Sequence, residues 1–231
     1  ALRKLGMDVV VFEQAARFAR VGADINLTPN AVRALDGLGV GDALRETAAR
    51  PTHRISRTWD TGEETSRLPM SDEAERRYGA PQLTMHRGDL MAALEAAVPT
   101  ADVKLGHKAT AVVPRERGAT LQFADGSHQD VDVLIGADGI HSVVRTALLG
   151  AEHPIFTGVV AYRAVVPAER LAGVPNIGAF TKWWGAEPSS QIVTFPLNRG
   201  REIFVFATVA QDSWRHESWT TPGNVADLRA A

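Results

Sequence analysis

The sequence predicts an α/β fold, in which a parallel βαβ portion is combined with a mostly antiparallel sheet. Residues 8–13 form a short apolar strand after a helical turn that Gly6 ends. Residues 131–136 have the pattern of a buried strand that leads into a helix. Residues 156–209 are rich in β-formers, and the Asn-Arg-Gly turn at 198–200 joins two long strands as a hairpin.

The other elements follow from start and stop signals along the chain. Thr28 and Pro29 are an N-cap and a first helical residue, and Gly39 or Gly41 ends that helix. Residues 51–79 alternate short β-like pieces with turns, and the charged run 72–77 is expected on the surface. A helix begins near residue 87 and ends before Pro99. Three further strands are expected at 103–105, 108–113 and 119–124.

Composition narrows the class of protein. The chain has 231 residues, of which 45% are hydrophobic and 23% charged, as in an ordinary globular protein. A formal net charge of -2 gives no electrostatic support for binding nucleic acid or an anionic membrane. The absence of cysteine excludes disulfides, thiolate metal sites and a cysteine nucleophile. We expect a cytoplasmic protein with a small-molecule partner and no nucleic acid, membrane or metal partner.

Both ends lie inside helical patterns, and the chain has no initiator methionine. The first residues continue a helix, and the last eight, 224–231, show no stop signal. We therefore expect a fragment of a longer protein.

Two acidic residues follow predicted strands and are the first candidates for binding a ligand. Glu13 ends the strand at 8–13, a place where an acid can receive the ribose hydroxyls of a bound dinucleotide. Asp138 and Gly139 follow the strand at 131–136 and precede a helix, a place suited to hydroxyls and phosphate. The alternative for Asp138 is that it only caps the helix that follows. The alternative for Glu13 is that it has no binding role, because an acidic residue after an apolar strand is common.

Two arginines are candidates for contacts with an anionic or carbonyl-rich ligand. Arg20 precedes a glycine-containing loop, and Arg87 stands at a helix start, where the helix dipole favours an acid. A solvated side chain is the alternative for Arg20, and a salt bridge to Glu95 or Asp89 is the alternative for Arg87.

These pieces in this order resemble the class A FAD-dependent aromatic monooxygenases, the para-hydroxybenzoate hydroxylase-like group, in particular its salicylate hydroxylase and 6-hydroxynicotinate 3-monooxygenase branch. The resemblance implies an incomplete Rossmann-like FAD-binding domain at residues 1–50 and 80–153. It implies a substrate domain, a mostly antiparallel sheet with a flanking helix, at 51–79 and 154–231.

The resemblance also assigns roles to the candidate residues. Glu13 would bind the adenosine ribose of FAD, Arg20 and Arg87 would lie along the cofactor, and Asp138 with Gly139 would bind the ribityl chain. Ser142 and Arg145 complete that last motif. The implied reaction is hydroxylation of a small hydroxybenzoate- or hydroxypyridine-like substrate with O₂ and with NADH or NADPH as co-substrate.

The resemblance implies substrate contacts from the sheet as well. Asn26, Trp184, Gln191 and Phe195 are the candidates, and sheet packing is the alternative for the aromatic residues. Gln191 and Phe195 stand where 6-hydroxynicotinate enzymes carry His and Tyr, which disfavours that substrate. No catalytic residue is assigned, because His53 and His141 are better explained as structural.

The sequence departs from the family pattern at two places. The glycine-rich turn that precedes the first helix and a later Gly-Asp segment are missing, so the chain as given is expected to bind FAD poorly. Asp24 replaces a usual glycine, which puts the local backbone path in question. The other functions that fit are a same-fold flavin oxidoreductase without oxygen insertion, or a non-catalytic protein of the prenyl-GTPase escort type. A homodimer is also considered.

Overall fold

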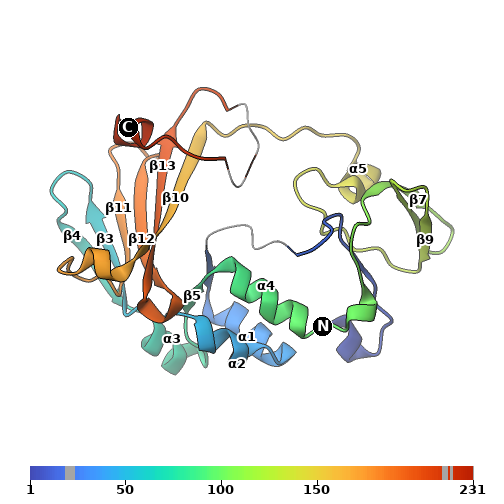
Figure 1. The fold of residues 1–231 in the computed structure, drawn as a ribbon, viewed down its shortest axis with the longest axis horizontal. Coiled ribbons are helices and arrows are strands. Elements are labelled where there is room, and N and C mark those ends of the chain that lie inside the picture. The colour runs from blue at the N-terminus through green and yellow to red at the C-terminus, as the bar shows by residue number, and fades with distance from the viewer. Residues whose placement is uncertain (19–23, 215–217, 219–220, 231) are drawn as a thin grey trace. The chain divides into compact units, whose positions relative to one another are not determined.

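The computed structural model describes residues 1–18, 24–214, 218 and 221–230. The chain divides into two compact units, each of which draws on two stretches of sequence. We call residues 1–19 with 98–156 the meander unit, and residues 20–97 with 157–231 the sheet unit (Figure 1).

The meander unit begins with a short parallel strand pair. The 3-10 helix η1 (Leu2–Leu5) ends at Gly6, which has a left-handed φ of 80° as expected of a C-cap glycine. Strand β1 (Val11–Phe12) then pairs in parallel with β6 (Val103–Lys104), which follows the 3-10 helix η2 (Thr100–Asp102). The Phe12 ring packs 4.7 Å from the ring of Phe123, and this contact holds β1 against the neighbouring sheet.

That neighbouring sheet is a three-stranded antiparallel meander. It consists of β7 (Ala109–Pro114), β8 (Ala119–Phe123) and β9 (His128–Val131), and the helix α5 (Val143–Leu149) follows. Gly118 is required at the first hairpin, because it has a φ of 82° and a Cβ there would lie 1.9 Å from the carbonyl oxygen of Val131.

The predicted strand at 131–136 is wrong in this structure. Strand β9 ends at Val131, and within the described residues nothing pairs with 132–136. Val133 is 76% exposed and Ile135 is 64% exposed, although their pattern is that of a strand buried on both faces. A strand of that kind is formed by hydrogen bonds to its neighbours, so an apolar sequence without a paired neighbour stays irregular.

The helices of the sheet unit enclose a small core of their own. Thr28 precedes α1 as the N-cap, Pro29 is its first residue, and Gly39 ends it with a φ of 86°. The charged run 72–77 lies inside a helix that the sequence analysis did not predict, α3. The elements here are β2 (Ile25–Leu27), α1 (Pro29–Leu38), α2 (Gly41–Thr47), α3 (Ser71–Tyr78), β5 (Leu83–Met85) and α4 (Arg87–Ala96), with β2 antiparallel to β5. Their buried side chains include Val32, Leu44, Leu83 and Met85.

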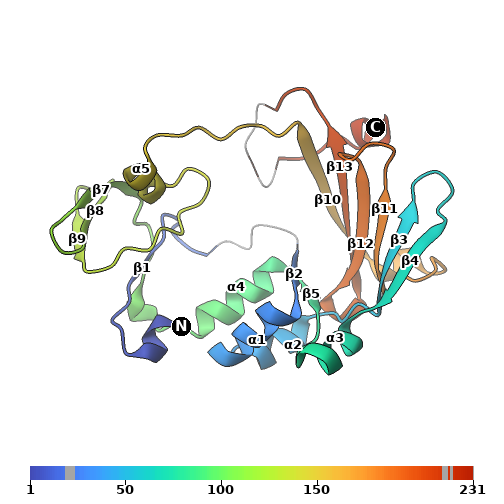
Figure 2. The same ribbon diagram turned by 180° about the vertical axis from the view of Figure 1, so that it is seen from behind.

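The rest of the sheet unit is a six-stranded sheet, drawn from behind in Figure 2. Its order is β10-β13-β12-β11-β3-β4, and β11 with β3 is its parallel pair, so it is mostly antiparallel as predicted. The elements are β3 (His53–Thr58), β4 (Glu64–Pro69), β10 (Val159–Pro167), the 3-10 helix η3 (Ala168–Leu171), β11 (Phe180–Trp184), β12 (Gln191–Leu197), the 3-10 helix η4 (Asn198–Gly200), β13 (Glu202–Ala210) and α6 (Val225–Ala230).

The compact units and the predicted functional domains have different boundaries. Residues 24–50 and 80–97, expected in the FAD-binding domain, belong to the same compact unit as the six-stranded sheet. The assignment of segments to cofactor and to substrate therefore stays a prediction. In the part of the chain that the structure describes, no helix is long and apolar enough to cross a membrane.

Candidate functional site

Glu13 lies at the carboxyl end of β1 and is held there by the backbone. Its N–H donates to the carbonyl of Lys104 at 2.9 Å, and its own carbonyl accepts the N–H of His107 at 2.9 Å. The side-chain Oε1 accepts the N–H of Ala15 at 2.8 Å. A half-buried carboxylate fixed at a strand end is an acceptor suited to ribose hydroxyls.

Asp138 caps the start of α5, as the alternative interpretation proposed. Its Oδ1 accepts the hydroxyl of Ser142, and its Oδ2 accepts the N–H of Val143 at 2.7 Å and that of Val144 at 3.3 Å. A carboxylate offers about four acceptor positions, so these three bonds leave capacity for one more donor, such as a ligand hydroxyl. Capping and ligand binding by Asp138 are therefore compatible.

The charge of Asp138 is stabilised by this capping. Desolvation raises the pKa of Asp138, but the hydrogen bonds from Ser142 Oγ and from the two amides outweigh it, so the pKa lies below its ordinary value of 3.8. Asp138 is therefore ionised at neutral pH, when a carboxylate is purely an acceptor for hydroxyl groups.

The backbone around Asp138 depends on two glycines. Gly139 has a φ of 82°, a conformation that side chains disfavour. At Gly136 an added Cβ would lie 2.7 Å from the Cβ of Val144, so the chain packs directly on α5 there. The guanidinium of Arg145 donates to the carbonyl of Ile140 at 2.7 Å and closes the loop from the other side. This loop presents the carboxylate and exposed backbone together.

Arg87 and Arg20 differ in what the structure records. Arg87 is the first residue of α4 and is exposed, with His86 as the N-cap. A guanidinium there faces the positive end of the helix dipole, which leaves it suited to an anionic ligand. Arg20 lies outside the described residues, so its predicted cofactor contact stays a prediction.

Two of the predicted substrate residues face each other across neighbouring strands. Trp184 on β11 and Gln191 on β12 are directly paired, so their side chains share one face of the sheet. Trp184 is 47% exposed, and Gln191 is half-buried. Asn26 is exposed on β2, and its Oδ1 accepts the amide of Gln82 at 2.5 Å.

Phe195 lies on the same face as Gln191 but is buried in the core. It is 4% exposed, its ring stacks on Phe180 with 4.9 Å between centroids, and Phe204 lies 5.0 Å away on its other side. This is the sheet packing that was the alternative for Phe195, and a substrate contact by this residue stays a prediction.

Sequence analysis missed a cation on this face. Lys182 lies two residues before Trp184, so the two side chains point the same way, and its Nζ is 3.4 Å from the centroid of the Trp184 ring. Burial lowers the pKa of Lys182, and the nearby Arg54 lowers it further. The alternation of side chains along the strand was the signal that could have identified it.

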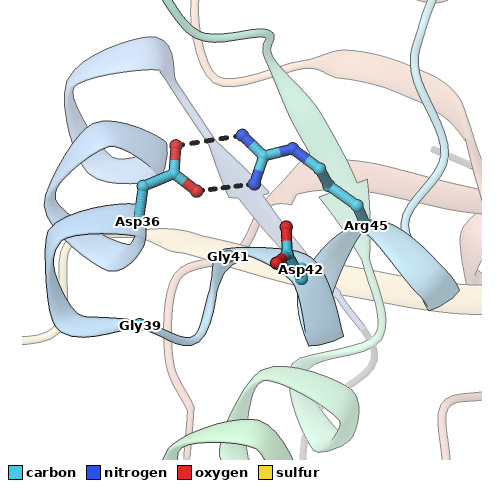
Figure 3. Close-up of a pocket in the computed structure, with 5 residues that line it drawn as sticks. All are labelled: Asp36, Gly39, Gly41, Asp42 and Arg45. Atoms are coloured by element: carbon cyan, nitrogen blue, oxygen red, sulfur yellow. Dashed lines mark hydrogen bonds and ion pairs between the residues drawn. The ribbon is translucent and has the colours of Figure 1, made fainter.

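A cavity lies elsewhere in the described part of the chain. It measures about 350 Å³ and is lined by Asp36, Gly39, Gly41, Asp42 and Arg45 (Figure 3). The Arg45 guanidinium binds both carboxylate oxygens of Asp36, at 2.5 Å and 2.9 Å. A Cβ on Gly41 would lie 1.7 Å from Asp36 Oδ1, so the glycine makes room for this pair. The cavity is a junction between α1 and α2, and no predicted site residue lines it.

The described residues contain no cluster of three or more His, Cys, Asp or Glu side chains that could hold a metal ion.

Comparison with known sequences shows which proteins the chain resembles. The chain is 37% identical over its whole length to 6-hydroxynicotinate 3-monooxygenase from Bordetella bronchiseptica, of which it covers 60%. It is 34% identical to 3-hydroxybenzoate 6-hydroxylase from Klebsiella oxytoca over 93% of this chain and 55% of that protein. The chain thus spans a little over half the length of these relatives.

Comparison with solved structures shows the same fold. Klebsiella pneumoniae HpxO, solved with FAD and uric acid, matches with a TM-score of 0.79 at 23% identity, over 94% of this chain and 54% of that one. CtdE, solved with FAD and a substrate, also gives a TM-score of 0.79, at 20% identity, over 98% of this chain and 57% of that one.

The sequence profile of the FAD binding domain family matches residues 1–230, which is nearly the whole chain. The chain therefore belongs to the FAD binding domain family.

Proposed function

We propose that this protein is a flavin-dependent aromatic hydroxylase that acts on a small hydroxybenzoate- or hydroxypyridine-like substrate. The observation that carries the proposal is a pair of fixed carboxylates in one compact unit, Glu13 at the end of β1 and Asp138 before α5, in a chain whose family binds FAD. FAD, when bound, supplies the redox chemistry with NADH or NADPH and O₂.

The residues of this chain would bind and orient the cofactor. Glu13 would accept the hydroxyls of the adenosine ribose, and Asp138 would use its remaining acceptor position for a ribityl hydroxyl. Gly139 would let the backbone approach the cofactor without a side chain in the way. Arg20 and Arg87 would contact its polar groups. Each of these roles needs a donor or acceptor that the residue can supply.

The sheet face around Trp184 and Gln191 would bind the substrate. The exposed Trp184 ring offers a stacking surface, and the Gln191 amide can bond a ring hydroxyl. The Lys182 ammonium, held over the same ring, favours an anionic aromatic such as a benzoate. Asn26 and Phe195 are weaker candidates, since Asn26 bonds Gln82 and Phe195 is buried.

The identity of Gln191 and Phe195 bears on the choice of substrate. The relative with 37% identity is named for 6-hydroxynicotinate, whereas Gln191 and Phe195 lack the imidazole and phenol expected for that compound. A neutral amide and a buried phenyl ring offer fewer polar contacts to a pyridine nitrogen. We therefore propose a hydroxybenzoate rather than 6-hydroxynicotinate.

The experiment begins with the full-length protein and FAD. A yellow complex with a resolved flavin spectrum is expected, and its absence would favour the escort-type alternative. NADH and NADPH oxidation is then measured with a panel of hydroxybenzoates and hydroxypyridines, and the products are analysed by mass. A product that gains one oxygen atom supports the hydroxylase, whereas oxidation without such a product supports the oxidoreductase without oxygen insertion.

We propose in addition that the protein is cytoplasmic and forms a homodimer. Cell fractionation and sedimentation of the holoprotein test these two statements.

A further inference from the structure

A hydrogen-bonded pair links the start of α4 to the six-stranded sheet. The Nε2 of His86 lies 2.8 Å from Oε2 of Glu202, the first residue of β13. Both side chains are about one-third exposed, His86 at 29% and Glu202 at 32%. His86 is the N-cap of α4, and its carbonyl accepts the N–H of Asp89 in the first turn of that helix. The pair therefore connects the sheet to the residue directly before Arg87.

The position of Glu202 is fixed by the residues around it. Its strand neighbours Ile203 and Phe204 are at most 1% exposed. The preceding turn contains Asn198 and Arg199 with φ values of 46° and 57°, a strained path for residues other than glycine. That turn brings the Asn198 side chain close to the Glu202 carboxylate, where it lowers the pKa of Glu202 in addition to the larger effect of His86. The carboxylate is thus fixed from its own strand as well as from His86.

A second link lies deeper in the core and joins β5, the strand before α4, to the six-stranded sheet. The hydroxyl of Thr84, a fully buried residue on β5, donates to the carbonyl of Pro196 on β12 at 2.6 Å. The Thr84 hydrogen bond holds β5 itself. The pair of His86 and Glu202 lies at the end of β5, where α4 begins. The outer link is the one that involves the N-cap residue of α4.

We infer that His86 and Glu202 are positioning residues that hold Arg87 in place for its contact with FAD. The inference rests on the proposed function, which assigns that contact to Arg87. A long arginine side chain loses binding energy when its backbone is free to shift, because more conformations must be frozen on binding. An N-cap residue tied to a rigid strand limits that freedom at the backbone atom next to Arg87.

Other charged groups lie near His86 and shape the design of the experiment. Asp24, which lies directly before β2, interacts electrostatically with Arg163 on β10. It also interacts electrostatically with His86. Changing the charge of His86 would therefore act on several groups together. Substitution of Glu202 is the cleaner perturbation, because Glu202 contacts His86 through one defined hydrogen bond.

The test is a double-mutant cycle on the full-length protein, with the dissociation constant for FAD as the readout. Arg87→Met and Glu202→Ala are each expected to weaken FAD binding, Glu202→Ala by about threefold to tenfold. In the double variant Glu202→Ala is expected to add nothing to Arg87→Met, because Glu202 acts through Arg87. Glu202→Gln keeps an acceptor oxygen for His86 and is expected to restore most of the affinity.

The matched control is Glu169→Ala, which removes an exposed acid from η3, beside the strand end that pairs with Glu202. It is expected to leave the FAD affinity unchanged. Equal effects of Glu202→Ala with and without Arg87 would overturn the inference, as would full affinity in Glu202→Ala. If the wild-type protein does not bind FAD, or Arg87→Met binds it normally, the failure lies in the proposed function instead.

Discussion

Replacing Phe195 with alanine separates packing from substrate binding. The side chain is 4% exposed and lies between the rings of Phe180 and Phe204, at centroid distances of 4.9 Å and 5.0 Å. Phe→Ala in a core costs about 3–5 kcal/mol, because the buried area is lost and a cavity remains. The two ring contacts, at roughly 0.5–1.5 kcal/mol per aromatic pair, place the expected cost in the upper part of that range.

The assay is urea unfolding of the full-length protein, followed by circular dichroism. With an m-value of about 3 kcal/mol/M, the expected loss lowers the unfolding midpoint by about 1 M or more. Trp184→Ala is the control on the same face, since Trp184 is 47% exposed and its removal costs about 0.5–1 kcal/mol through the lost contact with Lys182. A midpoint that falls no further in Phe195→Ala than in Trp184→Ala would refute the reasoning.

Three further predictions concern single side chains. Lys182→Met is expected to weaken binding of an anionic substrate, with a higher KM, whereas an unchanged KM would remove Lys182 from the substrate site. Stability at neutral pH is expected to change little, because removing a charge that burial disfavours offsets the lost contact with Trp184. The pKa of Asp138 lies below 3.8, so the stability that its charge contributes is present at neutral pH and is lost as pH falls through the folded-state pKa. In urea titrations the stability deficit of Asp138→Asn should therefore be constant above about pH 5 and shrink below about pH 4, and a deficit that grows with acid would contradict this. Gly41→Ala should displace the Asp36 carboxylate and abolish its coupling to Arg45 in a double-mutant cycle, and retained coupling would show that the added Cβ is accommodated elsewhere. The free energy of unfolding should change by no more than about 1 kcal/mol, because a one-third exposed ion pair contributes little and alanine favours the helix.

Local signals in the sequence predicted the elements that depend on local chemistry. Gly6 and Gly39 end their helices with left-handed φ values, and the turn at 198–200 joins β12 to β13, as predicted. Each of these features is decided within a few residues, at positions with a positive φ that glycine tolerates best.

Elements that depend on distant partners were harder to predict. The apolar run 131–136 has strand chemistry, but no strand in the described part of the chain pairs with it. The short strands β2 and β5 were missed, because each is stabilised mainly by a partner more than 50 residues away. The helix α3 was taken for a surface run, since its charged residues leave no apolar stripe to identify it.

The candidate site also contains some residues that the sequence predicted and others that it did not. Glu13 and Asp138 were predicted from their places after strands, and the structure fixes both through backbone hydrogen bonds. Lys182 was overlooked, although alternation along its strand places it on the same face as Trp184. The pair of His86 and Glu202 was not predicted, because it depends on a contact across more than 100 residues.

The central claim is that Glu13 and Asp138 bind opposite halves of one FAD molecule. Binding of FAD, ADP and riboflavin to the full-length protein and to its Glu13→Gln and Asp138→Asn variants tests it most directly. Glu13→Gln is expected to weaken FAD and ADP by about tenfold and to spare riboflavin, whereas Asp138→Asn is expected to weaken FAD and riboflavin and to spare ADP. Wild-type affinities in both variants, or losses confined to the same half of the cofactor, would contradict the account.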